Sequence, residues 1–415
     1  MEQIYFGEIA EFRNGLNYGK DSYGKGSLLI GIPDFKDRFK PDYKSLGEIN
    51  PIDIIKEEDY LNKNDIIFVR SNGNKALVGR SLFIDRDIKA VFSGFCIRAR
   101  LTSQIIIPLF CAYFTRTDRF KSLIASSGGT SIQNLNQRIL ANVKIPLFSI
   151  KKQNQITKVL SDLDSKIAIN NKINAALEAM AKTLYDYWFV QFDFPDKNGK
   201  PYKSSEGKMI FNEELKREIP VGWEVKKLKE IAKTGSGGTP LKSKKEYYDK
   251  GNISWINSGE VNASFIISAK KYITQLGLDK SSAKLFKKGT ILMAMYGATA
   301  GQVSLIDFEA CTNQAICGIN PIDEKLKYYT KFSLEDLYQY LINLSTGSAR
   351  DNLSQDKIKE LNIIIPNEAL ISAFHNNINS NFDEILLNLK QNQKLSELRD
   401  WLLPMLMNGQ VSVGE

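Results

Sequence analysis

Ser127-Gly-Gly-Thr-Ser-Ile-Gln-Asn-Leu135 returns later in the chain as Ser345-Thr-Gly-Ser-Ala-Arg-Asp-Asn-Leu353, at an offset of 218 residues. A second pair of segments, Glu8-Ile9-Ala10 and Glu230-Ile231-Ala232, recurs at an offset of 222 residues. An offset that drifts by only a few residues over half of the chain indicates a tandem duplication with small changes in loop length. We therefore predict two similar units related by a pseudo-two-fold axis, a symmetry that suits a DNA partner.

Each half also contains a heptad seam, in which residues at spacings of four and three continue over more than four heptads. The seam of the first half consists of Ile156, Leu160, Leu163, Ile167, Asn170, Asn174, Leu177, Ala181, Leu184 and Trp188. The seam of the second half, 218 residues later, consists of Phe374, Ile378, Asn381, Ile385, Asn388, Asn392, Leu395, Arg399, Leu402 and Leu406. Both seams have asparagine at the same two central positions, which predicts paired polar layers that fix the register of the helices.

The connectivity predicts that these two helices run antiparallel. The second globular domain leaves the end of the first helix and enters the start of the second, and these ends are adjacent only in an antiparallel pair. Asn170 can then face Asn392, while Asn174 can face Asn388. A seam of 33 residues is about 50 Å long at about 1.5 Å per residue.

The predicted fold class is α+β. Two similar domains of mixed β/α structure are expected at opposite ends of an antiparallel two-helix coiled coil, with pseudo-two-fold symmetry. The first domain is expected over 1–149 and the first helix over 150–192. A linker with the second domain is expected over 193–367, and the second helix over 368–412.

Local patterns support this division. Residues 65–70, 91–101 and 289–295 are rich in β-branched and aromatic side chains, which predicts strands. A short helix is expected over 109–125. The polar stretch 193–222 contains several glycines and prolines, so it is predicted to be a linker or an edge hairpin.

The composition excludes several classes of protein. Hydrophobic residues make up 43% and charged residues 25% of the chain, which favours a packed core, and the formal charge of +9 is compatible with a polyanionic partner. The chain opens without a signal segment and has no run of 18 apolar residues, so we expect a cytoplasmic protein. His375 is the single histidine, which argues against a catalytic triad or a His-rich metal site. The four cysteines have neither zinc-site nor disulfide spacing; they are Cys96, Cys111, Cys311 and Cys317.

Catalytic motifs are also missing. The glycine-rich stretch Thr234-Gly-Ser-Gly-Gly-Thr-Pro240 lacks the lysine of a phosphate-binding loop, so a flexible turn near a partner surface is the favoured interpretation. A dinucleotide fingerprint, an amino-methyltransferase motif and a helicase motif are all absent. The chain is therefore predicted to recognise a partner without a catalytic site or a metal of its own.

Loops at equivalent positions of the two halves combine basic, aromatic and polar residues that could contact phosphates or base edges. The candidates in the first half are Tyr18, Lys20, Tyr23, Lys25, Arg70, Asn72, Lys75, Thr130 and Asn134. The candidates in the second half are Lys242, Lys244, Lys245, Tyr247, Tyr296, Thr299, Arg350 and Asn352. Arg350 is favoured as a base reader, because a guanidinium can hold guanine through two hydrogen bonds. An ordinary solvated loop accounts for any single one of them equally well.

Five short motifs accompany the order of domain, helix, domain and helix. They are Ile219-Pro-Val-Gly-Trp-Glu224, Gly237-Gly-Thr-Pro240, Tyr296-Gly-Ala-Thr-Ala-Gly301, Asn313-Gln-Ala-Ile316 and Leu398-Arg-Asp-Trp-Leu-Leu-Pro-Met-Leu-Met-Asn-Gly409. This combination resembles the specificity (S) subunit of type I restriction–modification systems over essentially the whole chain. The first half departs from the pattern, because it lacks the Pro-x-Gly-Trp entry and has a weaker Tyr-Gly-Ala-Thr equivalent.

The resemblance implies that each domain is a target-recognition domain that reads one half of a bipartite, asymmetric sequence in double-stranded DNA. The helices would set the gap between the half-sites and dock two methyltransferase (modification) subunits, and restriction subunits would join in the full complex. S-adenosylmethionine, ATP and Mg would belong to those partners, so no cofactor is expected in this chain. A rod of about 50 Å would span about 15 base pairs at about 3.4 Å each.

An alternative from another class is a coiled-coil adaptor that joins two protein-binding β domains and has no role in DNA binding. Salt separates the two hypotheses, since DNA binding weakens steeply with salt through counterion release.

Overall fold

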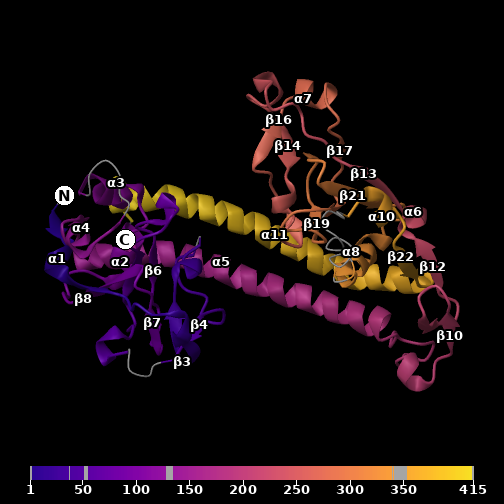
Figure 1. Ribbon diagram of the computed structural model, residues 1–415, viewed down its shortest axis with the longest axis horizontal. Helices are drawn as coiled ribbons and strands as arrows, with labels where there is room; N and C mark the ends of the chain where they lie inside the picture. Colours follow the sequence, from indigo (N-terminus) through magenta and orange to yellow (C-terminus); the bar gives the residue numbers. More distant parts are fainter. Residues whose placement is uncertain are drawn as a thin grey trace. The chain divides into compact units, whose positions relative to one another are not determined.

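Figure 1 shows the computed structural model, which describes residues 2–36, 38–50, 55–127, 134–338, 340 and 353–413. The chain divides into two compact units, one of residues 1–167 with 393–415 and the other of residues 168–392. Each unit therefore contains one globular domain together with parts of both long helices. The fold is α+β, and each unit is described by itself.

The first domain is built on an antiparallel sheet with the strand order β2-β8-β5-β6, next to a smaller sheet with the order β4-β3-β7. β3 and β7 are parallel, and β1 pairs with β9 in a separate ribbon. The elements in chain order are β1 (Gln3–Tyr5), α1 (Phe6–Ile9), β2 (Ala10–Asn14), β3 (Tyr23–Ile30), β4 (Gly47–Ile49), β5 (Ile66–Val69), β6 (Ser81–Phe83), β7 (Ala90–Phe92), β8 (Cys96–Leu101), α2 (Pro108–Phe114), α3 (Asp118–Ser127), α4 (Gln137–Ala141) and β9 (Lys144–Pro146).

The alternation of side chains along β5 explains how the larger sheet is covered on both faces. Successive residues of a strand point to opposite faces. Ile66 and Phe68 belong to the core formed with the helices, whereas Ile67 and Val69 belong to the core shared with β3 and β7. All four are fully buried, so this short run of apolar residues fixes the centre of the domain.

The second domain repeats this plan. Its larger sheet has the order β13-β21-β18-β19-β15 and its smaller sheet the order β16-β14-β20-β17. β14 and β20 are parallel, as β3 and β7 are, and β12 pairs with β22 as β1 does with β9. The elements in chain order are β10 (Met209–Asn212), β11 (Arg217–Pro220), β12 (Glu224–Lys227), α6 (Leu228–Ile231), β13 (Ala232–Ser236), β14 (Ile253–Ile256), β15 (Phe265–Ile266), β16 (Lys271–Ile273), α7 (Gln275–Asp279), β17 (Leu285–Phe286), β18 (Ile291–Ala294), β19 (Val303–Ile306), β20 (Ala310–Thr312), β21 (Ile316–Pro321), α8 (Leu326–Asp336), α10 (Gln355–Lys359) and β22 (Asn362–Ile365).

Two expectations for the first domain are corrected by the structure. Residues 91–101 form two strands, β7 and β8, which belong to different sheets. The chain turns between them at Gly94, where a Cβ would lie 2.2 Å from the side-chain oxygen of Asn17. The single helix expected over 109–125 is two helices, α2 and α3, because the Thr117 hydroxyl accepts the Phe120 N–H and so caps a new helix.

The two long helices are α5 (Ile150–Tyr185), which continues into a π-helical turn (Asp186–Val190), and α11 (Glu368–Met407). Both are slightly shorter than the sequence suggests. Every predicted seam position on each helix is buried or half-buried, which confirms the heptad pattern. The stretch before β12 contains the hairpin β10-β11, a two-stranded sheet of its own. Of the two alternatives for residues 193–222, a linker or an edge hairpin, the hairpin is therefore the one that forms.

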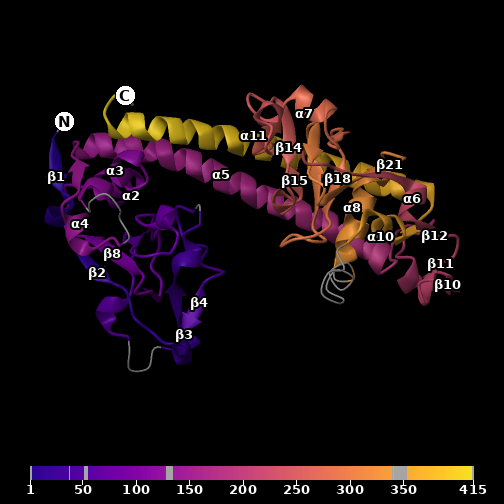
Figure 2. The ribbon, with the colours of Figure 1, turned by 45° about the horizontal axis from the view of Figure 1, so that its top comes forward.

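Contacts inside each unit show that α5 and α11 run antiparallel (Figure 2). In the unit of residues 168–392, the Asn170 side-chain amide donates to the Asn392 side-chain oxygen at 2.9 Å, and Asn388 donates to Asn174 at 3.0 Å. This is the pairing expected from the sequence. Asn170 is fully buried, and a buried amide pair is satisfied in one register only.

In the other unit, a charged cluster occupies the helix pair. The Arg399 guanidinium binds the Asp164 carboxylate at 2.8 Å, and the Tyr113 hydroxyl of the first domain donates to the same carboxylate at 2.7 Å. Both members of the ion pair are about one-fifth exposed. Asp164 on α5 therefore connects α11 and α2 through the two oxygens of one carboxylate.

We predict that Asp164→Ala destabilises the chain by about 1–3 kcal/mol, because the Tyr113 hydroxyl and part of the Arg399 guanidinium lose their acceptor. Asp162→Ala is the matched control on the same helix, since its pair with Lys158 is exposed and worth about 0–1 kcal/mol. Calorimetric unfolding of the full chain measures both variants. Equal losses of stability would contradict the role assigned to Asp164.

Candidate nucleic-acid interface

The first candidate loop presents two tyrosines. The rings of Tyr18 and Tyr23 meet edge to face with centroids 5.6 Å apart. Tyr23 is 60% exposed, whereas Tyr18 is half-buried, and this burial raises its pKa. Lys20 lies between them in a short 3-10 turn (Lys20–Ser22), and Lys25 is exposed on β3. The four candidates thus occupy one segment, in which the Tyr23 ring is exposed to solvent.

The second candidate loop follows β5. Arg70 is half-buried where the strand ends, and Asn72 and Lys75 come directly after it. An antiparallel bridge joins Ser71 to Asn134, which lies more than sixty residues later in the chain. The structure therefore brings two separately predicted segments together at one edge of the first domain.

The lysine-rich loop of the second domain is only partly as expected. Lys242, Lys244 and Lys245 are exposed, as a contact with an anionic partner requires, and the Lys244 ammonium lies 3.9 Å from the Glu246 carboxylate. Tyr247 is 8% exposed, and its carbonyl accepts the Thr274 N–H at 2.9 Å. The proposal that Tyr247 contacts DNA is therefore corrected, because its ring is part of the packing of this domain.

The glycine-rich stretch 234–240 is closely packed, which corrects the interpretation as a flexible turn. A Cβ at Gly237 would lie 2.1 Å from the Thr312 hydroxyl, and a Cβ at Gly238 would lie 2.3 Å from the Ser282 hydroxyl. These glycines allow two loops to approach the backbone, and any side chain would separate them.

Several of the short motifs meet at one end of the second domain. The Thr239 hydroxyl donates to the Gln314 side-chain oxygen at 2.5 Å. The Thr299 hydroxyl donates to the Ser258 carbonyl at 2.8 Å, and Tyr296 is half-buried beside it in the sequence. The Met295 N–H donates to the Ala315 carbonyl at 2.8 Å and links these two pairs. Four segments that are distant in sequence are thereby fixed relative to each other, as a binding surface requires.

Three predicted contacts, Thr130, Arg350 and Asn352, lie outside the described residues. Some exposed groups near these loops were not predicted from the sequence. Phe95 is 60% exposed, and its carbonyl accepts the Arg70 N–H at 2.7 Å, so it borders the second candidate loop. Seven further lysines between residues 250 and 288 are exposed as well. The high frequency of lysine in this part of the sequence was the signal that could have identified them.

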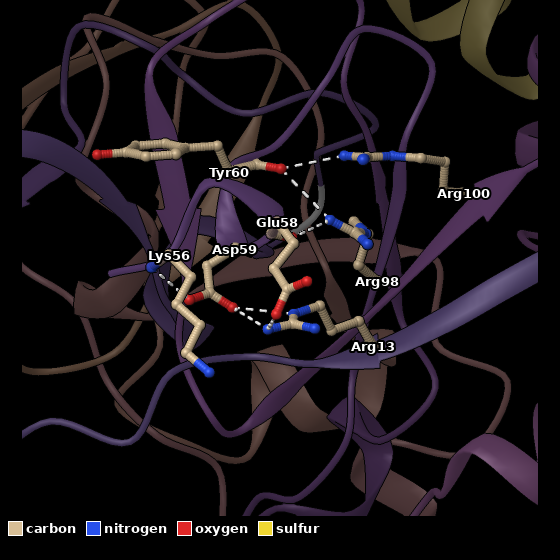
Figure 3. A network of polar contacts seen from close by, with 7 residues as sticks. All are labelled: Arg13, Lys56, Glu58, Asp59, Tyr60, Arg98 and Arg100. Carbon is tan, nitrogen blue, oxygen red and sulfur yellow. Dashed lines mark hydrogen bonds and ion pairs between the residues drawn. The ribbon is translucent and has the colours of Figure 1, made fainter. Parts of the chain in front are cut away.

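Two acidic residues and one arginine fix a turn of the first domain (Figure 3). Arg13 on β2 binds the Asp59 carboxylate at 2.7 and 2.9 Å and reaches Glu58 at 2.9 Å. Asp59 also accepts the backbone N–H of Lys56 at 2.8 Å. The short turn that carries these residues (Glu57–Asp59) is thereby attached to the larger sheet.

Two arginines on β8 complete this network. Arg98 donates to the carbonyls of Glu58 and Tyr60 at 2.9 and 3.3 Å, and Arg100 binds the Asp65 carboxylate at 2.8 Å. Burial is the main cause that lowers the pKa of Arg98, and the charge of Arg100 adds to it. These guanidinium groups stabilise the domain, because they donate hydrogen bonds to carbonyls and a carboxylate of the same domain.

The thiols are unsuited to nucleophilic chemistry. Burial raises the pKa of Cys96 and Cys317 to about 12 and that of Cys311 to about 11, so these thiols stay protonated at neutral pH. Among the described residues, histidine, cysteine and acidic side chains nowhere gather into a group that could hold a metal ion. No helix within the described ranges is long and apolar enough to span a membrane.

Comparisons with known proteins give a consistent result. The family described as the type I restriction modification DNA specificity domain matches residues 7–179 and 220–399. The type I restriction enzyme MjaIX specificity subunit of Methanocaldococcus jannaschii is 30% identical over 315 residues, which cover 75% of this chain and 70% of that protein. The type I restriction enzyme HindI specificity subunit of Haemophilus influenzae is 27% identical over 409 residues, with 85% and 87% of the two chains covered.

A solved structure agrees on the fold. The S subunit of a type I restriction–modification system from M. genitalium aligns with 98% of this chain and 95% of its own, with a TM-score of 0.56 and 15% identity. The family match falls once on each half of the duplicated sequence and covers most of the chain. This protein therefore belongs to the family of type I restriction–modification DNA specificity proteins.

Proposed function

We propose that this chain is the DNA-recognition subunit of a type I restriction–modification complex, in which each domain reads one half of a bipartite target. The observation that carries this proposal is the double family match, at residues 7–179 and 220–399. It coincides with two domains that share the order of their equivalent strands and a parallel pair of strands, with one additional strand in each sheet of the second domain. The adaptor alternative has no comparable support.

Apolar stripes on the helices support the docking of two methyltransferase subunits. Ile169, Ile173 and Met180 are exposed on α5, and their spacing places them on one face, beside the buried seam. Their counterparts on α11 at the offset of 218 include Leu387 and Leu398, which are exposed too. The counterpart of Ile173 is Gln391, so two of the three positions are apolar on both helices. An exposed apolar stripe fits a protein interaction surface, and its partial repetition fits two copies of one partner.

The chain itself would be non-catalytic and would bind no cofactor. Its sequence lacks nucleotide-binding and methyltransferase motifs, and its buried thiols stay protonated. S-adenosylmethionine, ATP and Mg would be bound by the methyltransferase and restriction subunits. The role of this chain is to place those subunits on a chosen DNA sequence.

The helix pair would set the distance between the two half-sites. The asparagine layers hold α5 and α11 in one register, so the spacing would be defined by the number of residues between the domains. A helix rises about 1.5 Å per residue.

Exchanging residues 1–146 for the first domain of another family member tests the proposed function. We expect the new complex to methylate a sequence altered in one half-site only, because the readers are separate domains. Mapping of methylated adenines in host DNA gives the target directly. A change in both half-sites would contradict the assignment of one reader to each domain.

Lengthening both α5 and α11 by one heptad next to the asparagines should widen the gap by about three base pairs. A heptad adds about 10.5 Å and preserves the seam. Insertion of four residues at the same positions is the control, and it should abolish assembly because it breaks the seam. An unchanged gap after the heptad insertion would show that the helices are not the spacer.

Met180→Asp and Leu398→Asp should each reduce the amount of methyltransferase subunit that co-purifies with the chain. A charge on an apolar interface costs several kcal/mol when it is buried. Leu276→Asp is the control, because Leu276 is 44% exposed, close to the 43% of Leu398, but lies in the second domain. Undiminished co-purification of both helix variants would place the docking surface elsewhere.

A further inference from the structure

Two segments of the repeat are equivalent in structure. Residues 15–65 connect β2 to β5, and residues 237–290 connect β13 to β18. Each contributes the central strand of the smaller sheet, β3 in one domain and β14 in the other. In both domains this strand is paired in parallel with a strand that comes later in the chain.

The two segments have opposite charge. Residues 15–65 contain eight basic and ten acidic residues, a net charge of −2, whereas residues 237–290 contain ten lysines and four acidic residues, a net charge of +6. The duplication has thus kept the fold of this segment while its electrostatic character diverged.

The lysines of residues 237–290 all reach the surface. They are Lys242, Lys244, Lys245, Lys250, Lys270, Lys271, Lys280, Lys284, Lys287 and Lys288. Within the described part of the chain, ion pairs involve Lys244, at 3.9 Å from Glu246, and Lys288, at 2.8 Å from Asp307. Most of this positive charge is therefore directed at solvent. Figure 1 shows β14, β16, β17 and α7, which carry or adjoin these lysines, gathered in one part of the second domain.

Several acidic side chains within 15–65 form ion pairs inside the first domain. Asp59 and Asp65 bind arginines of the larger sheet, and Asp42 lies 3.5 Å from Arg38. Asp59 and Asp65 are thus buried and stabilise the domain internally. With eight basic residues against ten acidic ones, this segment has no excess of positive charge to offer the phosphate backbone.

We infer that residues 237–290 form a surface that holds DNA backbone phosphates of any sequence, and that the equivalent segment of the first domain does not. This inference rests on the proposed DNA-recognition function. Lysine ammonium groups on flexible stems contact phosphates without reading bases. The two domains then share a fold but hold the DNA backbone with non-equivalent surfaces.

Two triple variants of the full-length chain test this inference. The first is Lys270→Gln, Lys271→Gln and Lys284→Gln, which lie at both edges of the smaller sheet. The control is Lys44→Gln, Lys56→Gln and Lys63→Gln, in which three exposed lysines are removed from residues 15–65. Both variants lose the same total charge, so any difference reports the local surface.

Binding to two unrelated fluorescent duplexes is measured by anisotropy over a series of NaCl concentrations. Each lost phosphate contact makes the negative slope of log K against log salt shallower by about 0.9. The slope of the first variant should therefore become shallower by up to about 2.7 on both duplexes. The control should keep the wild-type slope. Unchanged thermal unfolding of both variants shows that the domains remain folded.

Equal losses in the two variants, or an unchanged slope in the first, would overturn the inference alone. A loss confined to one of the two duplexes would also overturn it, since phosphates carry no sequence. A wild-type chain that binds neither duplex at low salt would instead overturn the proposed function together with this inference.

Discussion

The pairing of two long helices through buried asparagines is the constraint on which the other features depend. Apolar residues alone would let antiparallel helices slide by a heptad, because each new alignment buries a similar surface. Asn170 and Asn388 find side-chain amide partners in one alignment, and a slid alignment would leave these amides buried without them. Because the helices have a single alignment, two separately folded domains can act together in one DNA-recognition protein.

Much of the fold could be predicted because the duplication tests each pattern twice. The seams are confirmed position by position, and the strand Ile66–Val69 has its counterpart in Ile291–Ala294. The division of residues 91–101 was missed because the cause is a tertiary contact, the close approach of Gly94 to Asn17. No local propensity reports such a contact.

The candidate interface was harder to predict for a physical reason. Tyr247 and Lys245 are neighbours in a loop that reads as polar, yet one is buried and the other exposed. Arg98 and Arg100 would count as basic residues in any sequence argument, but the structure shows them bound to carbonyls and to Asp65. Whether a cation faces a partner depends on what already surrounds it, and that is a property of the folded domain.

The arginine network of Figure 3 shows that the formal charge of a domain does not determine the charge that its surface presents. Residues 1–149 contain 21 basic and 16 acidic residues, and residues 193–367 contain 26 and 21, so both domains have a formal charge of +5. In the first domain, arginines are matched at contact distance, and their fields cancel within a few ångströms. In the second, ten lysines of residues 237–290 outnumber four acidic residues, and the field of the lysines that make no ion pair within the described residues extends to about the Debye length. Two domains with the same formal charge would therefore bind with different strength to a polyanionic matrix such as heparin. The formal charge counted from the sequence would not reveal this difference.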